Sequence, residues 1–407
     1  MKVNRARRMI TIAAAVGLAC TALAGPHAGA ESLEDRLGAT VETWRTAHEG
    51  HAVSVSVRVP DRGIAWDDAA GDVRQYWPAS ADTLYRIGSA TKTFTATMIL
   101  QLADEGRISL DDPLAQWYPQ YPGAAHITVR NLLQHTSGIK EMQLEDAWFI
   151  LISFLQSWRI WRPEEMIAWS ASPLPMLSLR TGKLVDRTPD PAGTVWRYAQ
   201  PNYILLGRIL EKVTGRSYAR NLRARIAGPL GLAHTRLPAT GDDPFMPAWS
   251  NLFGLFPILL PTTIVASYNS ASSAAWSAGG IVTTTSDLVR FHEAVETGEL
   301  VSPRAFEEMH TTFVEDPAHP GRDGYGLGLS RSTLGSHTTW GHDGGIPGFV
   351  TVNRFEAACG VYLVVASNAD DDPAPDPGAT PAPDARHLDQ LGATLLDTVD
   401  DGIGCPP

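Results

Sequence analysis

The sequence predicts an α+β fold in which strands from both chain ends form one antiparallel sheet, flanked by helices, around an inserted all-helical region. Apolar and polar residues alternate over 51–58 (HAVSVSVR), as in a half-buried strand. Comparable strand patterns return near the other end of the chain, at 348–355 and 361–367. Apolar residues between them recur with a helical period. This order favours one sheet with an insertion over repeated strand–helix–strand units.

The N-terminal part should supply further short strands and the first long helix. Strand patterns follow at 63–66 and 83–87. Residues 89–105 then carry a helical stripe that includes Phe94, Met98 and Leu102, and Gly106 is typical of a helix C-cap.

The middle of the chain is predicted to be rich in helices, and strands return before a last helix. The expected helices cover residues 129–134, 163–169, 203–214, 218–227, 286–297 and 386–399. The expected later strands cover 326–330, 337–340, 348–355 and 361–367. Residues 369–384 (ADDDPAPDPGATPAPD) indicate an exposed, extended loop within the domain.

The first 30 residues have the pattern of a secretory signal peptide. Positive residues precede a short apolar stretch, Met9 to Ala19, and two small-residue cleavage sites follow, ending at Ala24 and Ala30. The Arg7-Arg8 pair leaves the twin-arginine route open beside the general one. We therefore expect a protein secreted to the extracellular or cell-wall space, with residues 31–407 forming one domain.

Charge and cysteine content narrow the function classes. The formal net charge is −11, and removal of the signal, with four positive charges and no acidic ones, takes it to −15. Such an acidic chain offers no basic patch for nucleic acid. No later segment has 18 uninterrupted apolar residues, so no transmembrane helix is expected. In an oxidising compartment the remaining pair, Cys359 and Cys405, suggests one disulfide.

Ser89 and Lys92 place a hydroxyl and an amine one helical turn apart, at the start of a predicted helix. Acyl-transfer enzymes that activate serine with lysine need this arrangement. The chain has five lysines against 28 arginines. A general base must release its proton, which a desolvated lysine does and arginine does not. This spacing therefore favours a serine nucleophile with a lysine base.

Two later motifs complete an ordered set with Ser89-Ala90-Thr91-Lys92. They are Tyr198-Ala199-Gln200 and Trp340-Gly341-His342-Asp343-Gly344-Gly345. Carrying these motifs, the chain resembles the penicillin-recognising serine hydrolases, in the branch of the class C β-lactamases and the Streptomyces-type D-alanyl-D-alanine carboxypeptidases. Residues 131–139 (NLLQHTSGI), 277–287 (SAGGIVTTTSD) and 325–329 (YGLGL) support it.

The resemblance implies a role for each motif residue. Ser89 resembles the acylated nucleophile, and Lys92 the amine that takes or relays its proton. Tyr198 resembles the tyrosine that protonates the leaving group and activates water. His342 resembles the first residue of the third motif, on a strand beside the site.

The same resemblance names the substrate-binding residues. Gln200, Asp343, Gly344 and Gly345 would contact substrate, and the Gly345 and Ser89 N–H groups would form the oxyanion hole. Gln200 replaces the family's asparagine, and Asp343 stands where the family's carboxypeptidases and β-lactamases carry a hydroxyl residue.

Asp343 matters because of its charge. A carboxylate facing the pocket would repel a substrate carboxylate by on the order of 1–4 kcal/mol, unless Arg331 compensates. The resemblance therefore implies a D-alanyl-D-alanine carboxypeptidase-like enzyme, with esterase, D-aminopeptidase and β-lactamase activities as alternatives.

Other function classes fit the sequence less well. A Ser-His-Asp hydrolase would need a G-x-S-x-G elbow, and a metallo-hydrolase would need H-x-H-x-D or H-E-x-x-H spacing; neither is present. A non-catalytic muropeptide-binding protein stays open as a second alternative. We expect a monomer without cofactor or metal. The apolar segments 148–161 and 252–265 indicate core packing or an apolar rim, the latter suited to transient membrane-surface contact.

Overall fold

The computed structural model describes residues 31–48, 51–74, 77–156, 158–238, 248–250, 263–265, 269–311, 314–315, 322–369 and 386–405. Residues 33–407 form one compact unit. The expected signal peptide lies outside the described residues, as do nearly all of the Asp/Pro-rich loop and most of segment 252–265. The domain bounds derived from the sequence stay a prediction.

Strands from both chain ends form one antiparallel sheet, as predicted. Within the described ranges it has nine strands in the order β11-β12-β13-β14-β16-β17-β1-β2, and β15 pairs with β16. Val53 of β1 lies opposite Ser367 of β17, and Arg58 lies opposite Tyr362. The strands are β1 (Val53–Val59), β2 (Ile64–Ala70), β11 (Val314–Glu315), β12 (Arg322–Tyr325), β13 (Ser330–Leu334), β14 (His337–Gly341), β15 (Gly344–Ile346), β16 (Phe349–Glu356) and β17 (Val361–Ser367).

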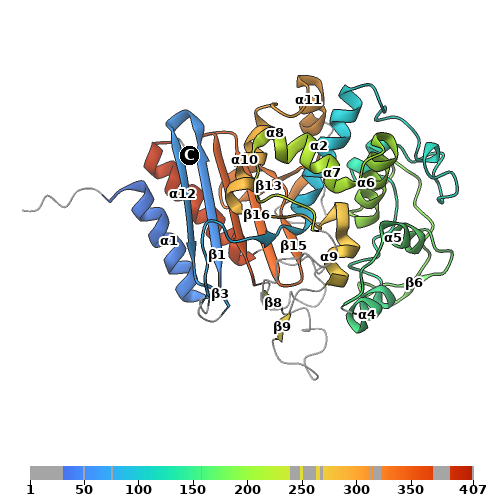
Figure 1. Ribbon diagram of the computed structural model, residues 1–407, viewed down its shortest axis with the longest axis horizontal. Coiled ribbons are helices and arrows are strands. Elements are labelled where there is room, and N and C mark those ends of the chain that lie inside the picture. The colour runs from blue at the N-terminus through green and yellow to red at the C-terminus, as the bar shows by residue number, and fades with distance from the viewer. Residues whose placement is uncertain are drawn as a thin grey trace, which may run out of the picture. The chain divides into compact units, whose positions relative to one another are not determined.

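Helices cover both faces of this sheet (Figure 1). Helices α1 (Leu33–Ala47) and α12 (Arg386–Ile403) share a core with the valines of β1, including Val53, Val55 and Val57. On the other face, α10 (Thr285–Glu296) and α2 (Thr91–Asp104) belong to the larger core, which includes Val364 of β17.

Strand β1 is buried on both faces, so the expected half-buried strand is wrong in that respect. Its polar residues Ser54 and Ser56 are 0% exposed. They find hydroxyl partners instead of water: Ser54 Oγ lies 2.9 Å from Tyr85 Oη, and Ser56 Oγ donates to Thr285 Oγ1 at 2.9 Å. The alternating sequence of β1 therefore gives the strand one valine face and one serine face, and both faces are buried in the protein.

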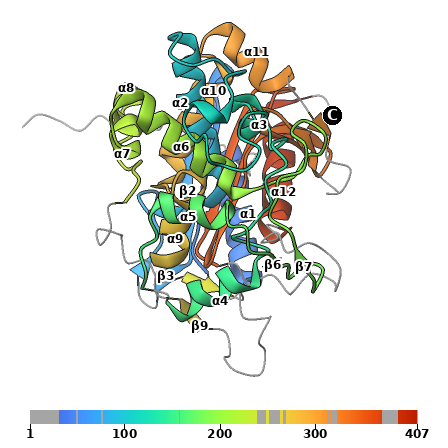
Figure 2. The ribbon, with the colours of Figure 1, turned by 90° about the vertical axis from the view of Figure 1, so that its right-hand side faces the viewer.

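The inserted region packs α2, α3, α5 and α6 together, and Figure 2 shows it facing the viewer. Its α-helices are α3 (Val129–Leu133), α4 (Ala147–Leu155), α5 (Pro163–Ser170), α6 (Gln200–Thr214), α7 (Tyr218–Leu222), α8 (Gly228–Leu230) and α9 (Asn269–Ala275). Helix α11 covers Pro303–Thr311. The short strands are β3 (Asp72–Arg74), β4 (Trp77–Pro78), β5 (Tyr85–Arg86), β6 (Met176–Leu177), β7 (Leu184–Val185), β8 (Ala248–Ser250), β9 (Thr263–Val265) and β10 (Val282–Thr283).

Three local expectations differ from the structure. The strand expected at 326–330 is wrong, because 326–329 forms the connection between β12 and β13, where Gly328 has a φ of +85°. The helix expected over 218–227 changes at Arg223 into a π-helical turn that ends at Ala227. Helix α1 was not predicted, although Leu33, Leu37, Val41 and Trp44 give it an apolar stripe.

The apolar segment 148–161 is divided between core and surface. Phe149 and Trp161 are buried, at 3% and 4% exposure. Trp148, Leu155 and Trp158 are 52%, 59% and 72% exposed. Core packing is therefore confirmed for Phe149 and Trp161, and an apolar rim stays a prediction for the exposed residues. Among the described residues, no helix is long and apolar enough to cross a membrane.

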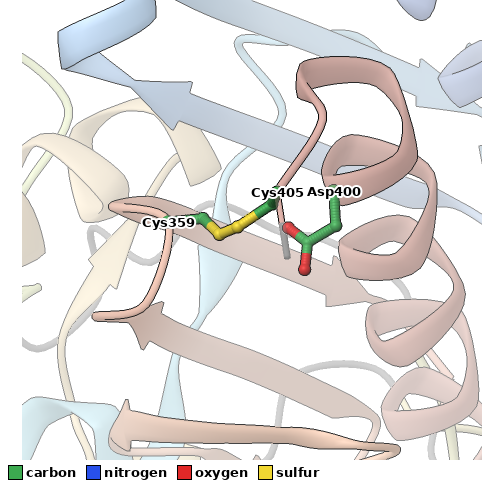
Figure 3. A group of neighbouring side chains, drawn as sticks. All are labelled: Cys359, Asp400 and Cys405. Carbon is green, nitrogen blue, oxygen red and sulfur yellow. A yellow bond between two sulfur atoms is a disulfide. The ribbon is translucent and has the colours of Figure 1, made fainter. Parts of the chain in front are cut away.

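Cys359 and Cys405 form the expected disulfide, with their Cα atoms 6.1 Å apart (Figure 3). Cys359 lies in the turn between β16 and β17, and Cys405 follows α12. The bridge therefore ties the last helix to the central sheet.

Removing this bridge should destabilise the protein. The cysteines are 46 residues apart, and a closed loop of that length corresponds to about 4 kcal/mol of unfolded-state entropy. We expect Cys359→Ser/Cys405→Ser to lose roughly 2–4 kcal/mol of unfolding free energy in urea titrations. A reducing agent should lower the unfolding free energy of the wild type by a similar amount, and it should leave that of the double variant unchanged. Equal unfolding midpoints for oxidised and reduced wild type would contradict the expectation.

Candidate active site

Ser89 lies in a 3₁₀ turn, Gly88–Ala90, that leads directly into α2. Its side chain is half-buried, whereas Gly88 and Ala90 are buried. Within the turn the Ala90 N–H donates to the Ile87 carbonyl oxygen and the Thr91 N–H donates to the Gly88 carbonyl oxygen. The expected continuous helix from Ser89 thus begins with a tighter turn, and the hydroxyl stays accessible.

Lys92 is completely buried, and its ammonium position is fixed by three oxygens. Lys92 Nζ lies 3.0 Å from Ser89 Oγ, 2.6 Å from Gln200 Oε1 and 2.8 Å from the Ala278 carbonyl oxygen. The amide and carbonyl oxygens only accept hydrogen bonds. When Lys92 is neutral, its two N–H groups therefore donate to Gln200 Oε1 and to the Ala278 carbonyl oxygen. The lone pair of Nζ then faces the Ser89 hydroxyl.

Gln200 begins α6 and reaches Lys92 from across the site. Its side chain is 6% exposed, and its Oε1 accepts from Lys92 Nζ at 2.6 Å. We predicted a contact with substrate for this residue. The structure directs its amide oxygen to the lysine, and the contact with substrate stays a prediction.

The Tyr198 ring lies between Lys92 and the third motif. Lys92 Nζ is 4.7 Å from the ring centroid. The His342 ring centroid is 6.2 Å away and that of Tyr325 is 6.3 Å away. An aromatic ring this close to an ammonium also gains a cation–π attraction. The structure thus brings the first and second motifs together around one amine.

His342 is buried and follows β14, rather than lying within the strand as expected. Its Nδ1 is 2.7 Å from the Asp343 carbonyl oxygen, which only accepts, so Nδ1 carries a hydrogen. Its Nε2 is 2.9 Å from Tyr325 Oη. In the neutral imidazole, Nε2 therefore accepts from the Tyr325 hydroxyl. Tyr325 belongs to the YGLGL stretch, and it fixes the orientation of His342.

Asp343 forms an ion pair with Arg354, whose side chain is 4% exposed. The Asn353 backbone N–H also donates to Asp343 Oδ1 at 3.3 Å. The structure therefore does not present Asp343 as an uncompensated negative charge. The compensating arginine is Arg354 of β16, and not Arg331 as suggested from the sequence.

Strand β15 approaches the Ser89 turn so closely that only glycine fits. A Cβ on Gly344 would lie 1.8 Å from the Ile87 carbonyl oxygen and 3.0 Å from the Ser89 nitrogen. A Cβ on Gly88 would lie 2.7 Å from the Gly345 nitrogen. The backbones that carry the Gly345 and Ser89 N–H groups are therefore in close contact, and the oxyanion hole between these groups stays a prediction.

His135 holds the Tyr198 segment and was not predicted as a site residue. It is completely buried, with a φ of +62°, which is unusual for a residue other than glycine. Its Nδ1 lies 3.2 Å from the Ala199 backbone nitrogen and 2.9 Å from Asn202 Nδ2. Its ring packs on Tyr198 at 4.4 Å between centroids. Backbone strain at this position is thus used to orient the second motif.

Glu141 is a buried carboxyl behind Lys92 and was also missed. Its Oε2 accepts from the Gln200 backbone N–H at 2.6 Å. Its Oε1 accepts from the N–H groups of Gln143 and Leu144, at 2.5 and 3.1 Å. Burial raises the pKa of Glu141 to about 7, although these hydrogen bonds and the charge of Lys92 oppose the shift.

The pKa of Glu141 predicts a pH-dependent stability. Since the pKa of Glu141 in the folded protein, about 7, exceeds the ordinary value of 4.5, the unfolded chain releases this proton at lower pH. Stability should therefore fall as pH rises from about 4.5 to about 7, with a contribution on the order of 3 kcal/mol. Glu141→Gln should remove the Glu141 contribution to the loss of stability between pH 5 and pH 8. Urea unfolding at these two pH values measures it. The exposed Glu307→Gln serves as control, and an unchanged pH difference in Glu141→Gln would refute the assignment.

Comparison with known proteins agrees with this geometry. A family model described as beta-lactamase matches residues 31–386. The chain belongs to the beta-lactamase family. Its relatives in this family include the putative penicillin-binding protein PbpX of Bacillus subtilis, which is 26% identical over 311 residues, 76% of this chain and 67% of that protein.

Two solved structures share the fold of this chain. A D-stereospecific amidohydrolase from Streptomyces sp. is 31% identical, with a TM-score of 0.69 over 86% of this chain and 96% of that one. The D-amino acid amidase from Ochrobactrum anthropi SV3 has a TM-score of 0.72 over 90% of this chain and 99% of that one. At 23% identity, the latter supports the fold alone. The protein is thus a serine hydrolase of this family with the β-lactamase/DD-peptidase-like fold.

Proposed function

We propose that this protein is a D-stereospecific amidohydrolase that forms an acyl-enzyme on Ser89. The observation that carries the chemistry is the position of Lys92 Nζ, 3.0 Å from Ser89 Oγ and held by Gln200 Oε1 and the Ala278 carbonyl. The 31% identity with a D-stereospecific amidohydrolase, over 96% of that chain, supports the substrate class.

The proposed reaction begins with transfer of the Ser89 proton to neutral Lys92. Ser89 Oγ then bonds to the acyl carbon, and the carbonyl oxygen gains negative charge between the Ser89 and Gly345 N–H groups. The C–N bond then breaks, and the leaving amine takes the proton from Lys92 through Tyr198, whose ring lies 4.7 Å from Lys92 Nζ. Water next attacks the acyl carbon of the ester and gives one proton to the same base. The bond from the acyl carbon to Ser89 Oγ breaks, Ser89 Oγ takes that proton, and the acid is released.

D-Alanyl-D-alanine carboxypeptidase activity is the second candidate. The Asp343–Arg354 ion pair favours it, because it removes the electrostatic objection to a substrate carboxylate. Against it, the hydroxyl residues expected to hold that carboxylate are absent at Asp343 and Gly345. A D-amino acid amide has no carboxylate for such hydroxyl residues to hold, so we rank amidase activity first. Esterase and β-lactamase activities are subordinate alternatives.

The test compares substrates on the purified protein. We expect release of ammonia from a D-amino acid amide, with a higher kcat/KM than for the L-enantiomer, a D-Ala-D-Ala peptide, nitrocefin or p-nitrophenyl butyrate. A fluorophosphonate should label the wild type and not Ser89→Ala. Higher kcat/KM on the D-Ala-D-Ala peptide would select the second candidate. Labelling that persists in Ser89→Ala would refute Ser89 as nucleophile, and a folded wild type without label or turnover would favour a muropeptide-binding protein.

We further propose that residues 1–30 direct export and that residues 31–407 act as a monomer in the extracellular or cell-wall space. The Cys359–Cys405 disulfide supports an oxidising compartment.

A further inference from the structure

A cluster of one histidine and three carboxyl groups lies between the sheet and α12, at the far end of β14 from His342. His337 begins β14, Glu356 ends β16, and Asp397 and Asp400 lie one turn apart on α12. Five residues of strand separate His337 from His342, which corresponds to roughly 16 Å. The cluster is therefore separate from the candidate active site.

The groups of this cluster face one another at short range. His337 Nδ1 lies 2.6 Å from Glu356 Oε1 and 3.5 Å from Asp400 Oδ2. His337 Nε2 lies 2.9 Å from Asp397 Oδ1. Ligand atoms of His337, Glu356 and Asp400 all lie within 4.8 Å of one another. One nitrogen and two carboxylate oxygens thus converge on a space that a single ion can reach.

No N–H or hydroxyl group among the described residues satisfies the two inner carboxylate oxygens of this cluster. The side chains of His337 and Glu356 are 7% and 5% exposed. Glu356 Oε2 and Asp400 Oδ1 are buried and receive no such donor, so that only a proton held between the two carboxyl groups joins them within the protein. Buried carboxylate oxygens without partners are costly, so such an oxygen points to a ligand outside the chain.

Charge is compatible with a metal at this position. With the imidazole protonated and one proton held between Glu356 and Asp400, two protons occupy the cluster. A divalent cation has the same charge as these two protons and can replace both. We propose that His337, Glu356 and Asp400 bind one divalent cation, with Asp397 orienting the imidazole through Nε2. An imidazole nitrogen beside two carboxylates selects zinc over calcium or magnesium, which prefer all-oxygen sites. Water would complete a tetrahedral shell.

The disulfide holds one ligand of this site in place. Figure 3 shows the Asp400 carboxylate beside the Cys359–Cys405 bridge at the end of α12. The Cys405 backbone N–H also donates to the Asp400 carbonyl oxygen at 2.9 Å. Zinc would therefore join β14, β16 and α12 where the disulfide already ties the last helix, and its role is to stabilise the fold.

The test measures zinc binding by calorimetry. The oxidised protein is first treated with EDTA and is then titrated with zinc chloride. We expect one zinc per chain and a higher thermal unfolding midpoint with excess zinc. His337→Gln and Asp400→Asn should each weaken zinc binding by more than about 100-fold. Loss of a residue that only hydrogen-bonds to a ligand lowers metal affinity by about 10–100-fold, and loss of the ligand itself should lower it further. His310→Gln is the matched control, since His310 also lies beside a buried carboxylate, at 3.1 Å from Glu296.

Three results would overturn the proposal. The first is a folded wild type that takes up no zinc, and the second is affinity unchanged in both His337→Gln and Asp400→Asn. The third is uptake that appears only after reduction, because it would assign the metal to the Cys359 and Cys405 thiols. Circular dichroism of each variant separates loss of binding from loss of fold.

Discussion

Lys92→Met should reduce kcat/KM by on the order of 10²–10⁴-fold, the usual contribution of a positioned general base. Methionine has nearly the length of lysine and no amine, so Ser89 would lose its proton acceptor. Gln200 Oε1 and the Ala278 carbonyl would also lose their donor in a buried site. Lys92→Arg should not restore activity, because arginine keeps its proton and is too large for a fully buried position.

The measurement is steady-state turnover together with the rate of fluorophosphonate labelling. Lys140→Met is the matched control. Lys140 pairs with Asp190 at 2.5 Å, and Asp190 retains Arg197 at 2.9 Å when the lysine is removed. Since the Lys140 side chain is only 12% exposed, we expect Lys140→Met to lose roughly 1–3 kcal/mol of stability and little activity. Wild-type labelling rates in Lys92→Met would exclude Lys92 as the base that activates Ser89.

The sequence predicted those features whose cause is local. Alternating residues marked β1, and β17 was placed with its observed bounds, Val361–Ser367. The spacing of Ser89 and Lys92 was enough to bring hydroxyl and amine within 3.0 Å, because a helical turn places them on one face. The same logic applied to α1, where the apolar stripe was present in the sequence and was overlooked.

Features that depend on tertiary contacts were not predicted. Arg354 neutralises Asp343 because Gly341 of β14 lies opposite Arg354 in β16, and the register of that pair is not visible in the chain. His135 begins the HTSGI stretch and Glu141 follows it by two residues, yet the sequence pattern reveals neither a positive φ nor a carboxyl enclosed by N–H groups. Only their position behind Lys92 and Tyr198 gives these residues a role.

Gly344→Ala should reduce kcat by on the order of 10²–10³-fold, comparable to loss of one oxyanion-hole donor. The new methyl group would lie 1.8 Å from the Ile87 carbonyl oxygen, so β15 and the Ser89 turn must move apart. Because the Gly345 and Ser89 N–H groups belong to these two segments, their separation would remove the site for the oxyanion. Ser89 and Lys92 belong to the same turn and helix, so their contact with each other should be kept.

The design separates this effect from a general loss of fold. Gly38→Ala is the control, because a Cβ there would make only ordinary contact, 3.7 Å from Asp68, within helix α1. Alanine in a helix should stabilise the protein by about 0.5–1 kcal/mol, whereas Gly344→Ala should destabilise it by roughly 1–3 kcal/mol through overpacking. Fluorophosphonate labelling, which also needs the oxyanion hole, should slow in parallel with kcat. If a folded Gly344→Ala variant keeps wild-type kcat, then β15 does not contribute to transition-state stabilisation, and the third motif would act only in binding.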